Sequence, residues 1–256
     1  MMNERLRRFY IDEIKANDNA CVITGSEARH ITKVLRMKPG DHFILLDGKG
    51  SRFKALIKST SPREVFVVLE NPLPKPPSSS VKITLCQGLP KSQAMDYLIQ
   101  KTSELGVDCI APFFSERTVV RFEEDRLANK MRRWREIAIN SAKQCGRGVP
   151  AKIEPPTYFR DLMAKWRREE ALKVVLWEDE ISNNLKELLK WSSSAKNFVG
   201  IVGPEGGFAR EEIETAEEAG FISVSMGDRI LRAETAAITL VAIVQYELGD
   251  LNPNVA

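Results

Sequence analysis

The stretch Phe198-Val-Gly-Ile-Val-Gly-Pro-Glu-Gly-Gly-Phe208 decides the fold class of this chain of 256 residues. It starts as an apolar strand, passes through three glycines and a proline between positions 203 and 207, and continues into Ala209-Arg-Glu-Glu-Ile-Glu214, which opens a helix. Because glycine has no Cβ, such a backbone turns tightly and presents N–H groups close to a ligand. The stretch predicts a strand, a binding loop and a helix, although a plain strand-to-helix turn has a similar composition.

A second segment of the same kind follows, Met226-Gly-Asp-Arg-Ile-Leu-Arg-Ala-Glu-Thr-Ala-Ala237. Arg229 and Arg232 bracket two apolar residues, and Glu234-Thr235 can cap the helix that comes next. A capping segment with two surface arginines is the simpler interpretation. Two such loops at the ends of consecutive strands favour a ligand site, because open α/β sheets bind ligands at the carboxyl ends of their strands.

Apolar runs alternate with segments of helical periodicity throughout the second part of the chain. The runs predict strands at 81–86, 109–112, 173–177, 198–202 and 222–226, and the periodicity predicts helices at 92–105, 125–144, 158–168, 184–189, 209–219 and 233–248. This alternation predicts an α/β domain with a largely parallel sheet. The cluster Arg132-Arg133-Trp134-Arg135 is interpreted as a solvated helix face around one buried tryptophan.

The segment 71–80 separates this part from the first, since it holds four prolines and ends in three serines. We predict a domain of residues 1–76, a linker at 71–80 and a second domain of residues 77–256. The first domain shows short strand-like runs at 21–23, 43–46, 53–57 and 65–69, which indicate a small barrel or meander. One short helix is expected at 26–35, with Ser26 as its N-cap.

Composition excludes several classes of protein. The apolar and charged fractions, 43% and 29%, are those of a soluble globular chain. Four scattered cysteines and two histidines argue against a disulfide scaffold and a metal site, so we expect core thiols and no metal. The longest apolar run, 236–244, is about half the ~20 residues that cross a bilayer, and no secretory signal is seen, so no membrane partner and a cytoplasmic location are expected.

The charge is unevenly distributed between the two parts. Residues 1–76 hold 14 Lys and Arg against 9 Asp and Glu, whereas the rest holds 24 against 26. This basic excess is compatible with a polyanionic partner without requiring one. Nucleotide motifs are missing: GxxxxGK[ST] does not occur, and Phe53 stands where GxGxxG would need its third glycine.

Several motifs, in order along nearly the whole chain, resemble the RsmE family of SPOUT methyltransferases. In the second part they are Gly203-Pro-Glu-Gly-Gly-Phe208, Arg229-Ile-Leu-Arg-Ala-Glu-Thr-Ala236, Gln100-Lys-x-x-Glu-Leu-Gly106, Ser115-Glu-Arg117 and Gln144-Cys-Gly-Arg147. In the first part they are Arg8-Phe-Tyr10, Arg29-His30 and Val34-Leu-Arg-Met-Lys-Pro-Gly-Asp41. The resemblance implies a PUA-like β-barrel domain that binds RNA, followed by a trefoil-knotted α/β methyltransferase domain.

The same resemblance implies an activity and partners. The implied activity is S-adenosylmethionine-dependent methylation of uridine N3 in 16S rRNA of the small ribosomal subunit. The implied enzyme is a homodimer. The implied cofactor-binding residues are Leu176, Glu178, Gly203, Glu205, Gly206, Met226, Ile230, Leu231, Arg232 and Ala236. A non-catalytic rRNA-binding or ribosome-assembly factor, or a related methyltransferase acting on tRNA, are the alternatives.

RNA binding requires basic and aromatic side chains, which the first domain supplies. The expected RNA-binding residues are Arg7, Arg8, Tyr10, Arg29, His30 and Arg36, although His30 can equally be a structural histidine. Methylation at N3 needs stabilisation of negative charge on the base, for which a permanently cationic arginine is suited. Arg232 is the first catalytic candidate and Arg8 the second. No general base is assigned, because Glu234 can equally be a capping residue.

Overall fold

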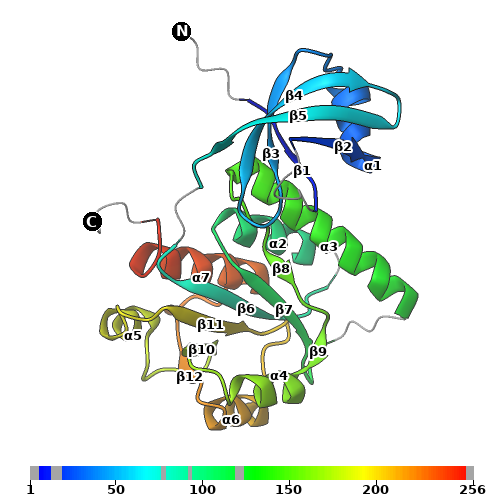
Figure 1. Cartoon of the computed structure of the whole chain (residues 1–256). Helices are drawn as coiled ribbons and strands as arrows, with labels where there is room; N and C mark the ends of the chain where they lie inside the picture. The colour runs from blue at the N-terminus through cyan, green and yellow to red at the C-terminus, as the bar shows by residue number, and fades with distance from the viewer. Residues whose placement is uncertain (1–5, 13–18, 76–78, 92–93, 119–123, 252–256) are drawn as a thin grey trace. The chain divides into compact units, whose positions relative to one another are not determined.

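The computed structural model describes residues 6–12, 19–75, 79–91, 94–118 and 124–251 (Figure 1). The chain forms two compact units. Unit 1 consists of Met1–Pro77 and Ala142–Pro150, and unit 2 of Ser78–Ser141 and Ala151–Ala256. Residues 142–150 thus belong with the first unit, although they lie far along the chain from its other residues.

Unit 1 is a five-stranded sheet with the order β1-β3-β4-β5-β2. Its strands are β1 (Arg8–Tyr10), β2 (Ala20–Thr24), β3 (His42–Leu46), β4 (Arg52–Thr60) and β5 (Glu64–Leu73). Strands β3, β4 and β5 form an antiparallel meander, and β1 pairs with β3 in parallel. The core is apolar and centres on the edge-to-face rings of Phe9 and Phe43, 4.8 Å apart.

Two local predictions for unit 1 are corrected. Strand β5 continues to Leu73, and Pro72 lies opposite Phe53 next to a register shift, so the first residues of the predicted linker are strand. A proline fits there because the ladder is irregular. The expected helix at 26–35 is an α-helix, α1 (Gly25–Arg29), followed by a π-helical turn, η1 (His30–Val34), and its N-cap is Thr24 rather than Ser26.

Unit 2 confirms the predicted α/β fold class. Its strand order is β12-β10-β11-β6-β7-β8, with β9 also paired to β7, and all of these pairs are parallel. The strands are β6 (Lys82–Gly88), β7 (Cys109–Phe114), β8 (Lys152–Ile153), β9 (Thr157–Tyr158), β10 (Leu172–Leu176), β11 (Asn197–Val202) and β12 (Ile222–Val224). The helices are α2 (Ala94–Glu104), α3 (Glu124–Cys145), α4 (Phe159–Trp166), α5 (Leu185–Trp191), α6 (Arg210–Glu218) and α7 (Ala233–Glu247).

The sheet buries both faces, each against its own set of helices (Figure 1). Ile83 and Leu85 of β6 point into the core shared with α2, α3, α5 and α7, whereas Cys86 points into the core shared with α4 and α6. This alternation follows from the two-residue period of a strand. Trp134 of α3 is 1% exposed between exposed arginines, which confirms the interpretation of that cluster.

Helix α7 lies directly on the sheet. A Cβ at Gly200 of β11 would meet Leu240 at 2.5 Å, so this glycine permits the close approach of helix and strand. Gln245, fully buried near the end of α7, donates to the Gly106 carbonyl at 3.2 Å. No helix within the described ranges is long and apolar enough to cross a membrane.

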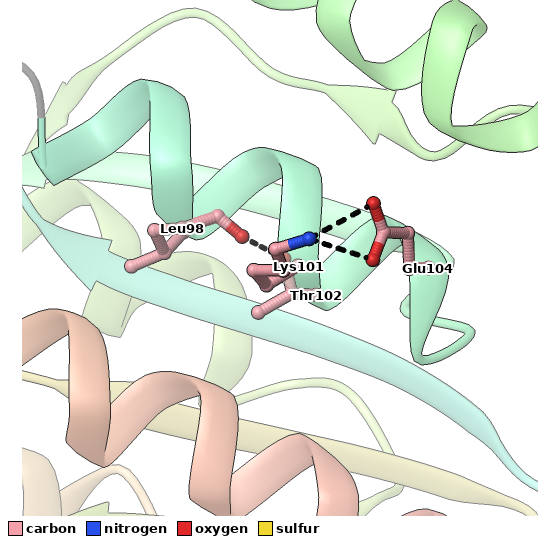
Figure 2. A network of polar contacts seen from close by, with 4 residues as sticks. All are labelled: Leu98, Lys101, Thr102 and Glu104. Carbon is pink, nitrogen blue, oxygen red and sulfur yellow. Dashed lines mark hydrogen bonds and ion pairs between the residues drawn. The ribbon is translucent and has the colours of Figure 1, made fainter. Parts of the chain in front are cut away.

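The charged residues of the motif at 100–106 are satisfied within α2 itself (Figure 2). Lys101 Nζ lies 3.2 Å and 3.0 Å from the two carboxylate oxygens of Glu104, and the Thr102 hydroxyl donates to the Leu98 carbonyl at 2.8 Å. The helix then stops at Gly106, which has a φ of 97°. These contacts give the motif at 100–106 a structural role within α2.

The cysteines are free thiols in different surroundings. Cys86 is buried, Cys21 and Cys109 are half-buried, and Cys145 is exposed, so the expectation of core thiols is wrong for Cys145. Burial raises the pKa of Cys109 to about 11 and also raises the pKa of Cys86. The thiols of Cys86 and Cys109 are therefore poor nucleophiles at neutral pH.

Candidate active site

A cavity of about 920 Å³ lies at the carboxyl ends of β10, β11 and β12. Its walls come mainly from the segments that leave these three strands, residues 176–181, 202–208 and 224–236. The two loops singled out in the sequence follow β11 and β12, and β10 lies between those strands in the sheet. Loops that are separate in sequence thus meet around one volume, at the edge where parallel sheets bind ligands.

Nine of the ten residues expected to bind the cofactor line this cavity. They are Leu176, Glu178, Gly203, Glu205, Met226, Ile230, Leu231, Arg232 and Ala236. Gly206 is not among the lining residues, and a Cβ there would meet Arg117 at 3.2 Å instead. Sequence reasoning missed Trp177, Glu180, Ile181 and Phe208, of which only Phe208 lies within a quoted motif.

The glycine loop, residues 203–208, has the backbone shape that its composition predicts. Gly207 has a φ of 66°, and its N–H donates to the Pro204 carbonyl at 3.0 Å, which closes a tight turn. A Cβ at Gly207 would lie 2.9 Å from Glu178 Oε1. Glycine is required at this position both for the backbone conformation and for the space that Glu178 occupies.

Contacts from β6 and from the segment after it hold the glycine loop in place. The buried side chain of Gln87 donates to the Gly203 carbonyl at 3.1 Å. Beyond the strand, the Lys91 backbone N–H donates to Glu205 Oε1 at 2.8 Å. Glu205 therefore commits one carboxylate oxygen to the protein while its residue lines the cavity.

A buried carboxylate joins the glycine loop to the segment after β7. Glu212, 8% exposed, accepts from the Ala209 backbone N–H through Oε2 at 3.1 Å and from the Glu116 backbone N–H through Oε1 at 3.0 Å. The first contact is the reach-back of a third helical residue to the N-cap. The second fixes Glu116, so that its neighbour Arg117 can donate from Nη1 to the Gly206 carbonyl at 3.1 Å.

On the β10 side of the cavity, Glu180 is held by hydrogen bonds. Its Oε2 lies 2.6 Å from the Ser223 hydroxyl, and its Oε1 accepts from the backbone N–H groups of Ser182 and Asn183 at 2.7 Å and 3.1 Å. The Ser223 hydroxyl and these N–H groups lower the pKa of Glu180. The cavity therefore has a fixed negative charge on this wall at neutral pH.

Two arginines of the second loop, Arg229 and Arg232, also line the cavity. Arg232 is the N-cap residue of α7 and is exposed, and its side chain makes no capping hydrogen bond. Its guanidinium is therefore not engaged in holding the helix. The helix begins at Ala233, with Glu234 in its first turn, so the expected capping by Glu234-Thr235 is replaced by a charge near the helix N-terminus.

The expected RNA-binding residues lie in unit 1, in two kinds of environment. Arg7, Arg29, His30 and Arg36 are exposed, whereas Arg8 and Tyr10 are half-buried. Arg8 Nη1 donates to the carbonyls of Lys143 and Gln144 at 3.2 Å and 3.1 Å, at the end of α3. This contact is a helix C-cap, with the glycine of the 144–147 motif leaving room for the guanidinium.

A parallel α/β sheet with a cavity between the loops at its carboxyl edge is typical of enzymes that bind a small ligand. The family model "RNA methyltransferase domain" matches residues 77–245, and the model "RNA methyltransferase PUA domain" matches residues 23–70. The chain belongs to this RNA methyltransferase family and, within it, to the family of ribosomal RNA small subunit methyltransferase E. The resemblance drawn from the motifs is confirmed.

Named relatives match along nearly the whole chain. Ribosomal RNA small subunit methyltransferase E of Mesomycoplasma hyopneumoniae is 32% identical and covers 91% of this chain and 96% of its own length. The protein of the same name from Buchnera aphidicola subsp. Schizaphis graminum is 30% identical, covering 98% and 100%. The solved structure of the Neisseria gonorrhoeae protein of that name, bound to S-adenosylmethionine, has a TM-score of 0.87 at 30% identity, covering 96% and 100%.

Proposed function

We propose that this protein methylates N3 of a uridine in 16S rRNA of the small ribosomal subunit, using S-adenosylmethionine. The observation that carries the proposal is the cavity at the glycine loop, in a chain of the same family as a relative solved with that cofactor. In this proposal unit 2 is the methyltransferase domain, and unit 1, to which residues 142–150 also belong, captures the RNA. The intact glycine loop speaks against the non-catalytic alternative.

The residues around the cavity fit S-adenosylmethionine. Its volume of about 920 Å³ is within the range of small-molecule sites. Apolar side chains such as Leu176, Val202 and Leu231 suit the adenine ring, and the glycine loop supplies backbone polar groups. The carboxylates of Glu178, Glu180 and Glu205 favour a cationic ligand. When bound, the cofactor supplies an electrophilic methyl group on a sulfonium.

The chemistry requires the protein to stabilise charge on the acceptor base. The imide proton leaves uridine N3 as the methyl group arrives, so negative charge develops on the base. Arg232 lines the cavity with an exposed guanidinium that caps nothing, and we assign the stabilisation to it. The guanidinium of Arg8 is committed to the end of α3, which makes Arg8 a weaker candidate for this role.

A methylation assay tests the proposed function. The protein is incubated with labelled S-adenosylmethionine and either naked 16S rRNA or small subunits that lack the modification. Digestion and mass spectrometry are expected to show N3-methyluridine, and the comparison identifies the preferred substrate. A methyl group on ribose, or on tRNA alone, would contradict the proposal, and RNA binding without transfer would favour the non-catalytic factor.

Filter binding of Arg29→Ala is expected to show weakened capture of the RNA by unit 1.

Gly207→Ala is expected to weaken S-adenosylmethionine binding at least tenfold. The added methyl group would lie 2.9 Å from Glu178 Oε1, so the loop or the carboxylate has to move. Gly220→Ala is the matched control, because Gly220 also has a positive φ, 88°, and the nearest atom to its Cβ is Lys173 Nζ at 3.7 Å, an ordinary van der Waals distance. Both variants carry about 1 to 2 kcal/mol of backbone strain. Calorimetry that gives both variants the same affinity would remove Gly207 from the site.

We also propose that the protein is a homodimer in solution. Helix α7 is apolar over much of its circumference, yet Ala236, Ile238, Ala242 and Ile243 are only partly buried within one chain. A helix of this composition is normally covered on all sides. Light scattering at micromolar concentration is expected to give twice the chain mass of 28.9 kDa, and the mass of a single chain would contradict the dimer.

A further inference from the structure

The two-residue strand β9 places an exposed aromatic side chain at the carboxyl end of β7. Tyr158 pairs with Phe114 across the two strands and is 69% exposed. The two rings lie 5.7 Å apart between centroids at an angle of 41°. Tyr158 is thus supported by Phe114 while most of its surface faces solvent, as expected of an aromatic platform rather than a core residue.

The turn that follows β7 carries an arginine, Arg117. Phe114 is followed by a turn in which the Ser115 and Thr118 backbones are hydrogen-bonded, and Arg117 lies within it. Three residues of chain span at most about 11 Å, so the backbone of Arg117 lies within that distance of Phe114. Arg117 Nη1 donates to the carbonyl of Gly206, which sits between two residues that line the cavity.

The charge of Arg117 is available for a ligand. Arg117 is exposed, and within the part of the chain that the structure describes no carboxylate forms an ion pair with it. One donor holds the side chain to the glycine loop, and among the described residues no acceptor is seen for the other guanidinium donors. A guanidinium that is anchored in this way loses less conformational entropy when it binds a phosphate.

We propose that Arg117 and Tyr158 form a subsite on unit 2 for the RNA strand beside the target uridine, where Arg117 binds a backbone phosphate and Tyr158 stacks on a flanking base. The inference rests on the proposed function, because the target base has to reach the cavity whose loop Arg117 contacts. Single-stranded RNA is recognised by such a combination of stacking and phosphate contacts. An exposed Tyr-Arg pair also suits a protein partner, and the experiment separates the two.

The test measures binding of a single-stranded 16S rRNA fragment that contains the target uridine without the modification, at several salt concentrations. Tyr158→Ala is expected to lower RNA affinity about 5- to 150-fold, whereas Tyr158→Phe keeps the ring and the affinity. Arg117→Ala is expected to lower the affinity and to reduce the slope of log affinity against log salt by about 0.7, the value for one phosphate contact on a single strand. The affinity for S-adenosylmethionine, measured by calorimetry, serves as the folding control for Tyr158→Ala.

Arg167→Ala is the matched control, because Arg167 is an exposed arginine at the C-cap of α4, the far end of the helix from Tyr158, and pairs with Glu218. It is expected to leave the affinity and the salt slope unchanged. An unchanged salt slope in Arg117→Ala would show that Arg117 only holds the glycine loop. Unchanged RNA affinity in Tyr158→Ala would favour a protein as the partner of Tyr158. Either result overturns the proposed RNA subsite. If the wild-type protein binds the fragment but transfers no methyl group to naked 16S rRNA or to small subunits, the proposed function fails while the binding test of the subsite still stands.

Discussion

Arg232→Ala is expected to slow methyl transfer to uridine N3 by about 10² to 10³ at saturating cofactor. Removal of one preorganised group that stabilises developing charge has an effect of this size. Arg232 lines the cavity from the N-cap of α7 and caps nothing with its side chain, so its removal should not disturb the helix. Single-turnover rates with S-adenosylmethionine in excess measure this effect without a contribution from product release.

Arg229→Ala is the control for Arg232→Ala. Arg229 is also an exposed arginine of the same loop that lines the cavity, so its removal changes the local charge by the same amount. We expect its rate to fall much less, because the effect at Arg232 depends on position as well as charge. Equal rates in the two variants would assign the effect to the general field of the loop, and a near-normal rate for Arg232→Ala would end its catalytic assignment.

Trp134→Ala is expected to lower the free energy of unfolding by about 3 to 5 kcal/mol, the usual cost of removing a large aromatic side chain from a core. Trp134 is 1% exposed and packs in the core that α3 shares with the sheet. Urea denaturation followed by circular dichroism measures the change. Because unit 1 and unit 2 can unfold separately, the transition has to be tested for two-state behaviour first.

Arg135→Ala is the matched control on the next residue of α3. Arg135 is exposed, and a surface substitution of this kind changes stability by less than about 0.5 kcal/mol. Its rRNA affinity is also expected to remain that of the wild type, since the arginines around Trp134 were interpreted as a solvated face. A marked loss of RNA affinity in Arg135→Ala would contradict this interpretation and show that this face of α3 binds RNA.

The fold class could be predicted from the sequence because it depends on local patterns. The helical period placed a helix at 92–105, and α2 spans Ala94–Glu104. The apolar run before the glycine loop is β11, Asn197–Val202. Such segments bury one face or run through the core, so their hydrophobic period records their structure. The glycine loop was equally readable, because a positive φ at Gly207 restricts the position to glycine.

Features that depend on contacts between residues far apart in the chain could not be predicted from the sequence. Strands β8 and β9 have two residues each, too short for any period, and only their pairing with β7 defines them. Arg8 was a catalytic candidate because its domain was expected to contact RNA. The sequence could not show that its partners are the carbonyls of Lys143 and Gln144, which are 135 and 136 residues away. Gly206 does not line the cavity and faces Arg117 instead, a residue of the turn after β7. The sequence does not show this contact either.

The hydrogen bonds that hold the glycine loop have a consequence for the folding of unit 2. Gln87 and Lys91 hold residues that are 116 and 114 positions later in the chain. Contacts of such sequence separation require loop closure before they contribute any stability, which is the property of topologies that fold slowly. The walls of the cavity, at 176–236, are therefore completed only when a much earlier part of the chain is in place. The ability to bind a ligand there reports that the whole of unit 2 has folded, and ligand binding in turn stabilises that final state by mass action.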